Sequence, residues 1–578
     1  MFEGRYRVTV LALAFVLAVT AIGIVRSRDR EAPPDPADVP RPTATGGEGE
    51  EVELPTKAYL RDACRMPAKW AQRIHRGWDA GPARSHDLVI VPSPRNYMGS
   101  FVNTSHSAPY DFLQEVPLVF YGPGFVEAQG RVAIEGREPT IADLAPTYAE
   151  LMDFDFRDGP SESLTELLRD VAHPPKLIFT AVIDGGGWNA LELWPDAWPN
   201  IRRLIDEGVN VEEAIVGSSP SITPATHTNL STGTFPRYHG VTAIAIRADD
   251  GSLIGSFSRA AGNPLGRATD PTVSLKKTTL ADEWDRSTNN EAKVGMLASG
   301  NLQAGMIGYG TALDGGDADI MAVRYGETWE TNPEFYSLPS YVNTEVEGPA
   351  GDLEALDRSD GAADGKWMGN DLDDVALDAS PAFAPWQNRT MQALLEREGF
   401  GRDDVTDLFY VNYKAPDKAG HKWNVIAPEQ EEALRSVDTA IGEMVEWLDD
   451  NVGRDEYLFV VTADHGQTPL EQGGWPILGS ELVADINAHF GVEGDASLIQ
   501  RTSASSFFSE KAEMKAQGVR PEQVASFVSR YRIGDNIPEG EEVPDGYEDR
   551  LDERIFDAAF PGRELPEVVA CTRALSGT

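Results

Sequence analysis

The chain has 578 residues and a mass of 62.9 kDa, a length that suits roughly two to four domains. A hydrophobic fraction of 41% permits a large packed core and excludes a wholly disordered protein. Fifty basic residues against ninety-three acidic ones give a net charge of −43. Because binding to nucleic acid depends on attraction to phosphates, no nucleic-acid polymer is expected as a partner, whereas a small phosphate ester held by metal ions stays compatible with this charge.

The amino end carries an uncharged apolar run over residues 8–25. Its length lies at the lower edge of what spans a bilayer, and we expect residues 1–30 to form a transmembrane anchor with the bulk of the chain outside the cytoplasm. A cleaved signal peptide, which gives a secreted protein, is the alternative. Residues 31–58 are rich in Pro, Gly and Glu and predict a flexible linker. Nothing in the sequence indicates the oligomeric state.

A first buried strand is predicted over residues 176–183, where a short apolar run precedes Asp184 and three glycines. Ligand sites in open α/β sheets lie at the carboxyl ends of strands, so Asp184 is a candidate ligand. A turn or helix-capping role is the structural alternative for this residue.

Several hydroxyl residues lie between Pro220 and Gly233, at the start of a predicted helix. Thr223 precedes Pro224 and suits a position just outside the helix amino terminus, where backbone amides and the helix dipole favour an anion. A metal-bound Thr223 is therefore a candidate nucleophile for phosphoryl transfer, and an ordinary helix cap is the alternative.

Two further buried strands have the same pattern. Residues 407–413 lead to Asp417 and His421, which are four positions apart and can meet on one face of a helical turn. Residues 457–463 lead directly to Asp464 and His465. Three strands that each end in carboxylate or imidazole ligands predict a metal centre, with zinc preferred over manganese or iron.

Taken together, these motifs resemble the alkaline phosphatase superfamily, and specifically its type I phosphodiesterase/nucleotide pyrophosphatase branch. The matching pieces occur in the order that the family has: Ile183-Asp184-Gly185, Pro220–Pro224 with Thr232–Gly240, Asp417–His421 and Asp464–Gly466. The resemblance implies a three-layer α/β/α sandwich with a mostly parallel sheet, and two divalent metal ions. One ion takes Asp184, Thr223, Asp464 and His465; the other takes Asp417, His421 and a further histidine.

In the family the last histidine lies downstream of the Asp-His-Gly motif, where this chain has only His489 on a predicted amphipathic surface helix. A matching stretch occurs instead near the amino end, around His106, with Val116–Gly124 and Pro139–Leu151 after it. The resemblance thus implies a circular permutation in which residues 59–160 correspond to the usual C-terminal portion and His106 supplies the seventh ligand. Residues 59–160 and 161–578 are expected to form one domain. A circular permutation requires that the termini of the unpermuted chain lie close together on its surface.

The permutation also predicts a disulfide between the two cysteines. Cys64 and Cys571 flank the point where the usual order of the family would be continuous, and an oxidising exterior compartment favours a bridge there. Two unrelated thiols are the alternative.

Two departures from the family pattern concern the substrate. Ser107 replaces the usual Gly after the histidine, and the segment after His239 lacks the Asn that often helps to hold the phosphate. Thr242 or Arg247 is a possible substitute. His227 and His239 are interpreted as structural.

These inferences predict metal-dependent hydrolysis of a phosphate diester, nucleotide or monoester, with Thr223 as nucleophile. A phosphotransferase or lipid-phosphate hydrolase at the membrane surface is one alternative. An inactive cell-surface binding protein on the same scaffold is another, although such a protein has no need for all seven candidate ligands.

Overall fold

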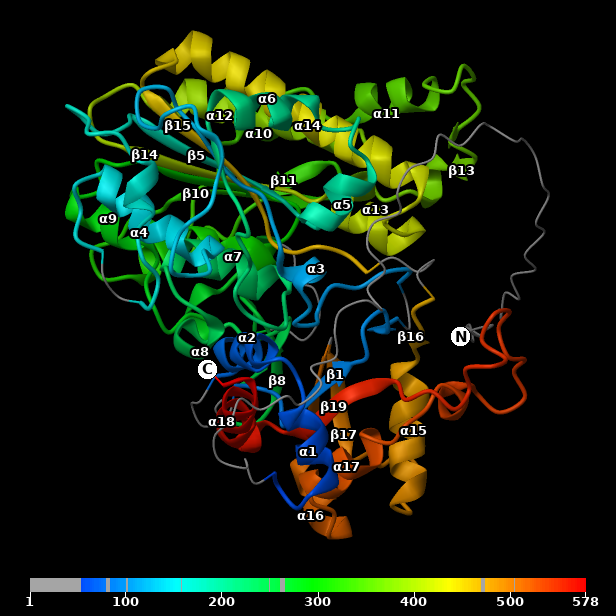
Figure 1. The fold of residues 1–578 in the computed structure, drawn as a ribbon. Helices are drawn as coiled ribbons and strands as arrows, with labels where there is room; N and C mark the ends of the chain where they lie inside the picture. The colour runs from blue at the N-terminus through cyan, green and yellow to red at the C-terminus, as the bar shows by residue number, and fades with distance from the viewer. Residues whose placement is uncertain are drawn as a thin grey trace, which may run out of the picture. The chain divides into compact units, whose positions relative to one another are not determined.

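The computed structural model describes residues 54–577 apart from 80–83, 100–101, 157–158, 249, 260–265, 469–472 and 504. Its larger sheet has nine strands (Figure 1). Only β3 and β11 run against the direction of the other strands of this sheet. The order is β11 (Thr328–Glu330), β10 (Ile320–Tyr325), β9 (Val294–Ala298), β14 (Asp407–Tyr413), β5 (Leu177–Ile183), β15 (Tyr457–Ala463), β3 (Leu118–Tyr121), β6 (Val209–Val211) and β4 (Gly130–Val132).

Helices cover both faces of this sheet. Alternate residues of β5 enter different cores: Phe179 packs with residues of α6 (Pro199–Glu207), α12 (Phe383–Glu398) and α14 (Pro428–Leu448). Ile178 packs on the opposite face with residues of α4 (Leu144–Leu151), α7 (Thr223–Thr232) and α9 (Leu280–Ser287). The expected three-layer α/β/α sandwich with a mostly parallel sheet is confirmed, and its buried central strands explain the continuous apolar runs in the sequence.

A second sheet has four antiparallel strands, in the order β17 (Ile499–Ser503), β18 (Ser506–Ser509), β1 (Leu88–Pro92) and β19 (Phe556–Pro561). It has its own apolar core, to which strands from both ends of the chain contribute. The helices of this core are α1 (Ala58–Cys64), α2 (Ala68–Gly77), α15 (Gly479–His489), α16 (Lys511–Gln517), α17 (Pro521–Val528) and α18 (Leu565–Ser576).

Shorter elements complete the described chain. They are α3 (Asp111–Gln114), α5 (Trp188–Leu193), α8 (Pro236–His239), α10 (Tyr341–Thr344), α11 (Ala350–Asp357) and α13 (Ala415–Trp423), and the strand pairs β2 (Tyr97–Met98) with β16 (Pro476–Ile477), β7 (Ala245–Arg247) with β8 (Leu253–Gly255), and β12 (Lys366–Trp367) with β13 (Asn370–Asp371).

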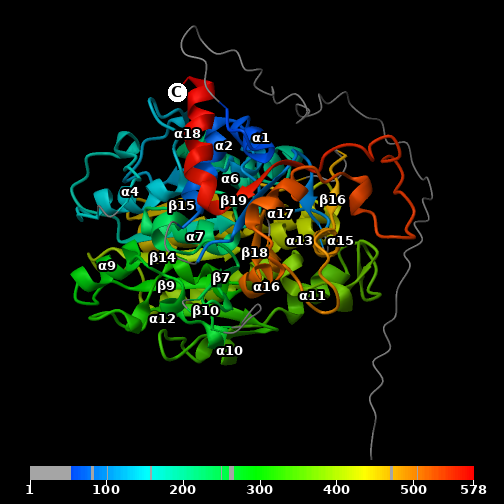
Figure 2. The ribbon, with the colours of Figure 1, turned by 90° about the horizontal axis from the view of Figure 1, so that it is seen from below.

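A disulfide joins Cys64 at the end of α1 to Cys571 in α18, which confirms the predicted bridge. Helix α18 also packs against α1 and α2, so that the first and last described helices lie side by side (Figure 2). The bridge therefore closes a loop with a sequence separation of 507 residues at a place where the two ends already meet.

The predicted anchor over residues 1–30 and most of the predicted linker lie outside the described residues. Within residues 54–577, gaps aside, no helix combines the length and the apolar character that crossing a membrane requires. The boundary drawn at residue 160 stays a prediction.

Candidate metal centre

Three neighbouring parallel strands end at the same edge of the large sheet and bring the motifs together. β5 lies between β14 and β15, and its last residue Ile183 is in register with Tyr413 and Ala463. Asp184 and Asp464 therefore follow paired strand positions and lie next to each other. The strand order alone accounts for the meeting of two acidic residues that are far apart in the sequence.

Gly185 allows the chain to turn sharply behind Asp184. Its φ of 70° lies in the left-handed region, and its amide donates a hydrogen bond to Asp464 Oδ1 at 3.0 Å. A Cβ at this position would lie 2.5 Å from Gln467 Nε2 and 3.0 Å from Asp417 Cα, so that the Gln467 side chain would have to move. The left-handed turn is the main reason for glycine here.

Three imidazoles share one hydrogen-bonding pattern. The Nδ1 atoms of His106, His421 and His465 lie 2.7 to 3.0 Å from the carbonyl oxygens of Ser221, Thr104 and Gly466, respectively. Because a carbonyl oxygen only accepts, each Nδ1 carries the hydrogen and each Nε2 keeps its lone pair. This is the tautomer that metal-ligating histidines adopt.

The three Nε2 atoms converge on Asp417. They lie 3.6 Å (His106), 3.2 Å (His421) and 3.9 Å (His465) from Asp417 Oδ1. Burial lowers the pKa of His465 to about 4 and holds the pKa of His106 well below its usual value, with the neighbouring imidazole as a second cause for His106. These two side chains are therefore neutral near pH 7, as metal ligands must be.

Several buried ligand atoms at this centre have no hydrogen-bond partner. They are Asp184 Oδ1, Asp417 Oδ1, Asp464 Oδ2 and His465 Nε2. The carboxylate and imidazole atoms fall into overlapping groups whose members lie within 4.8 Å of one another. Since buried polar atoms are normally satisfied, these atoms fit bound divalent cations, and the mixture of oxygen and nitrogen donors suits zinc.

Thr223 is the first residue of α7, so that this helix begins one position earlier than the sequence predicts. Ile222 is extended and Pro224 occupies the second helical position, which suits a ring with no amide hydrogen to donate. The Thr223 side chain is 6% exposed at this helix amino terminus. The helix dipole there favours the negative charge of an alkoxide or a phosphate.

Lys414 is a member of the centre that the sequence analysis missed. Its Nζ lies 2.8 Å from Asp184 Oδ2 and 2.7 Å from Asp417 Oδ2, and it donates to Thr223 Oγ1 at 3.3 Å. Burial alone would lower the pKa of Lys414, but the nearby carboxylates outweigh that effect and raise the pKa. The ammonium thus links the candidate nucleophile to both sets of candidate ligands.

Behind Asp184 lies a buried polar relay. Asn412 Nδ2 donates to Asp184 Oδ2 at 2.8 Å and to His227 Nε2 at 3.0 Å, and Gln303 Nε2 donates to Asn412 Oδ1 at 3.2 Å. His227 in turn donates through Nδ1 to the Thr223 carbonyl oxygen at 2.8 Å. His227 thus has a supporting part in this relay, while its Nδ1 lies 3.6 Å from Asp464 Oδ2. In the sequence, Asn412 stands out as a polar residue inside the largely apolar run 407–413, and this was the signal that could have identified it.

The segment that carries His106 is bonded to the other motif loops. Asn103 N donates to the His421 carbonyl oxygen at 2.9 Å, and Thr468 N donates to the Ser105 carbonyl oxygen at 2.9 Å. β3, which follows this segment, is paired between β15 and β6 in the large sheet. All seven candidate ligands therefore lie at one place, with Thr223 joined to the rest through Lys414.

Other residues weighed in the sequence lie in different surroundings. Arg247, at the end of β7, donates to Asp87 Oδ2 just before β1 and to the Ser509 carbonyl oxygen at the end of β18, so it links these three strands. Thr242 is buried with an unpartnered hydroxyl. His239 bonds Asn229 Oδ1. His489 lies exposed at the end of α15, as expected for a surface residue.

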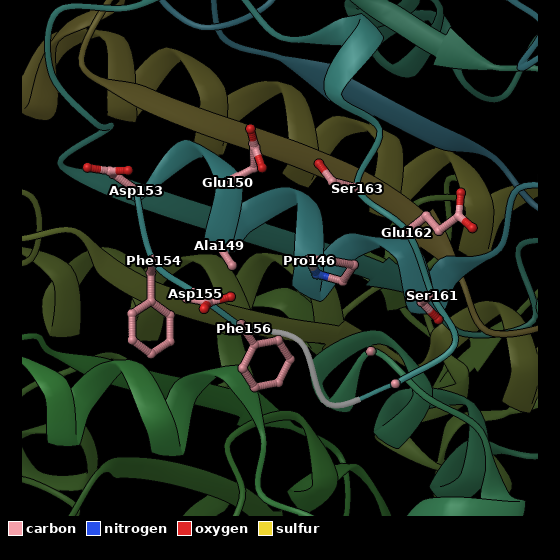
Figure 3. A pocket seen from close by; sticks show the side chains of 12 residues that line it. Pro146, Ala149, Glu150, Asp153, Phe154, Asp155, Phe156, Ser161, Glu162 and Ser163 are labelled. Carbon is pink, nitrogen blue, oxygen red and sulfur yellow. The ribbon is translucent and has the colours of Figure 1, made fainter.

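A pocket of about 660 Å³ lies between α4 and the loop that follows it (Figure 3). Carboxylates dominate its polar lining, and no candidate metal ligand borders it. Because four negative side chains would repel a phosphate, this pocket is not suited to the expected substrate. These side chains are Glu150, Asp153, Asp155 and Glu162.

Comparison with known proteins identifies relatives of the chain. The sequence model of the family "Type I phosphodiesterase / nucleotide pyrophosphatase" matches residues 181–568, more than half of the chain, and leaves the His106 segment outside the match. Alkaline phosphatase PhoV of Synechococcus elongatus is 22% identical over 51% of this chain and 59% of its own length. Alkaline phosphatase PafA of Elizabethkingia meningoseptica is 22% identical over 50% of this chain and 60% of its own length.

A crystal structure of wild-type PafA aligns with a TM-score of 0.48 and 18% identity, over 62% of this chain and 77% of that one. The chain thus spans about three-fifths of the length of the curated relatives it matches.

Proposed function

Because the chain belongs to the type I phosphodiesterase/nucleotide pyrophosphatase family of the alkaline phosphatase superfamily, we propose that it hydrolyses small phosphate esters with Thr223 as nucleophile. The observation that carries the proposal is the convergence of buried, unpartnered carboxylate and imidazole atoms beside a hydroxyl at a helix amino terminus. Such an arrangement suits covalent phosphoryl transfer.

The proposed ligand sets are those that the family resemblance implies, and the contacts among these side chains support them. Asp184, Thr223, Asp464 and His465 would hold one divalent ion, and Asp417, His421 and His106 the other, with Zn²⁺ the preferred metal. When bound, the ions supply positive charge for the phosphoryl oxygens and for the leaving oxygen.

Thr223 and Lys414 have separate parts in the reaction. Thr223 Oγ1 attacks phosphorus, the Oγ1–P bond forms, and the P–O bond to the leaving alcohol breaks with the proton of the hydroxyl passing to solvent. Lys414, within 3.3 Å of Oγ1, stabilises the negative charge that develops there. Water then attacks the phosphothreonine, inorganic phosphate or a monoester departs, and the Thr223 hydroxyl is restored.

The circular permutation is part of this proposal. Three observations support it: His106 faces Asp417, the disulfide joins the helices next to the old junction, and the family match begins only at residue 181. In the permuted order, residues 59–160 supply the strand and the histidine that close the site.

A pair of variants tests the nucleophile. Thr223→Ala removes the hydroxyl, and Thr223→Ser keeps it with little change in volume. With p-nitrophenyl phosphate and bis-p-nitrophenyl phosphate as probes, we expect Thr223→Ala to lose at least about tenfold in kcat and Thr223→Ser to retain most activity. Acid-quenched wild-type protein should carry phosphate on Thr223 by mass spectrometry. Full activity in Thr223→Ala with unchanged metal content would refute the assignment.

A further inference from the structure

A second group of carboxylates lies outside the metal centre. Asp285 is in α9, while Asp317 and Asp319 are in the loop that leads into β10. One oxygen from each of the three lies within 4.8 Å of the others. Asp285 is 3% exposed and Asp319 is 7% exposed, whereas Asp317 lies at the surface. The group thus has two buried members and one that opens to solvent.

Within the part of the chain that the structure describes, no Lys, Arg or His nitrogen lies within 4.0 Å of these three carboxylates. The group therefore has no ion-pair partner there. Asp285 Oδ1 is buried and has no hydrogen-bond donor. Asp285 Oδ2 has one neutral donor, the Asn290 amide at 3.1 Å, when that amide is turned to face it. Burying like charges without compensation is costly, so the arrangement requires a cation or bound protons.

The buried surroundings of Asp285 and Asp319 disfavour the ionised form of their carboxyl groups. Burial raises the pKa of Asp285 to about 7, with the charges of Asp317 and Asp282, and the hydrogen bond that the protonated Asp285 makes with Asp317, as further causes. Burial likewise raises the pKa of Asp319 well above its usual value. Asp282 cannot compensate the negative charge of the group, because it is a carboxylate itself. Its oxygens accept hydrogen bonds from Thr279 N and Tyr309 N.

We propose that Asp285, Asp317 and Asp319 form a Ca²⁺ site distinct from the metal centre. Calcium binds oxygen at about 2.3 to 2.6 Å, so one ion can contact oxygens up to about 5 Å apart, and the three carboxylate oxygens lie within 4.8 Å of one another. No imidazole or thiolate belongs to this group, and purely carboxylate ligands favour calcium over zinc. The Gly315 carbonyl oxygen, 3.1 Å from the same Asn290 amide atom, lies beside the site.

The position of this site gives it a structural consequence. The connection from β9 to β10 carries Gln303, which supports Asn412 behind the metal centre, and ends in Asp317 and Asp319. Ser231 of α7 also donates to the Gly305 carbonyl oxygen of this connection. A calcium ion would fasten the end of the connection to α9. The inference does not depend on the proposed reaction.

Titration of the purified full chain, with its metal centre loaded with zinc, tests the proposal. Calcium chloride is added to calcium-free protein, and binding is followed by calorimetry and by the unfolding midpoint. We expect one saturable site and a midpoint that rises by about 2 to 5 °C at saturation. Asp317→Asn, at the surface and therefore safe for folding, should weaken binding at least about tenfold, because affinity depends on ligand charge.

Two further variants make the result specific. Asp314→Asn changes an exposed carboxylate of the same loop outside the group and should leave calcium affinity unchanged. Asp319→Asn should abolish the calcium-dependent rise, while raising the midpoint in calcium-free buffer because one buried negative charge is gone. The proposal is overturned by a wild-type chain with no saturable calcium binding, or by Asp317→Asn binding calcium as tightly as Asp314→Asn does.

Discussion

The imidazole rings of His106 and His465 stack with centroids 3.4 Å apart and planes 2° apart, although the two residues come from opposite parts of the chain. Both rings present Nε2 toward Asp417 Oδ1 and hold Nδ1 on a carbonyl oxygen. Two stacked imidazolium ions would repel each other, so this geometry demands neutral rings. Metal coordination at Nε2 is compatible with that demand.

Lys414 gives a prediction about the metal-free protein. Its ammonium is the counter-charge that contacts both Asp184 and Asp417. Replacing it by Met leaves those buried carboxylates uncompensated, and we expect the free energy of unfolding to fall by about 3 kcal/mol in the presence of a chelator. Zinc should reduce that loss, because bound cations replace the missing charge.

Urea unfolding with and without zinc measures both effects. Lys418→Met, at a partly exposed position of the same helix α13, is the matched control and should change stability by less than about 0.5 kcal/mol. An equal loss for Lys414→Met in both conditions would contradict the placement of the ammonium among the ligands.

The disulfide predicts a large contribution to stability. Closing a loop with a separation of 507 residues restricts the unfolded chain, and the loop-entropy relation gives an upper figure of about 5 to 6 kcal/mol. The double variant Cys64→Ser/Cys571→Ser should therefore unfold at lower denaturant concentration. Wild type in reducing buffer should match it, whereas the double variant should not respond to reductant. Equal midpoints for the variant and the oxidised wild type would show that the bridge contributes nothing.

His86 predicts a pH dependence away from the metal centre. This side chain is fully buried, and burial lowers its pKa to about 4, below the unfolded value of about 6.5. The unfolded chain therefore takes up a proton first as pH falls, and stability is complete above about pH 6.5 and is lost toward pH 4. By linkage, His86 alone accounts for about 2 kcal/mol between pH 7.5 and pH 5.

Unfolding of His86→Leu across this pH range isolates that share from the other groups. The free energy of unfolding of His86→Leu should fall less steeply with decreasing pH than that of wild type. The difference in slope corresponds to about one proton fewer taken up on unfolding. His489→Leu changes an exposed histidine of α15 and should keep the wild-type slope. Parallel curves for His86→Leu and wild type would mean that His86 is protonated equally in both states.

The large sheet and most of the site could be predicted from the sequence for a physical reason. β5, β14 and β15 are buried on both faces, so that each is a largely apolar run; Asp184 and Asp464 directly follow β5 and β15, and Asp417 lies four residues after β14. His106 has no such local signal, and only the family resemblance pointed to it. The structure then places His106 against Asp417.

Lys414 and Gln303 have no such signal in the sequence. Lysine is normally exposed, and the buried position of Lys414 follows from Asp184, which the fold brings from the end of β5, and from Asp417 three positions further along the chain. Gln303 reaches Asn412 only because the β9–β10 connection packs behind β14. Similarly, Asp317 and Asp319 form a carboxylate group only because the fold brings Asp285 of α9 beside them.

Metal analysis of His106→Ala against wild type tests the central claim most directly. Both proteins are purified identically and measured by plasma mass spectrometry, with His489→Ala as control. The account predicts two zinc ions per chain in wild type and control, and one or fewer in His106→Ala, with a matching loss of hydrolysis of p-nitrophenyl phosphate. Two ions retained in His106→Ala with full activity would contradict the convergence of both parts of the chain on one metal centre.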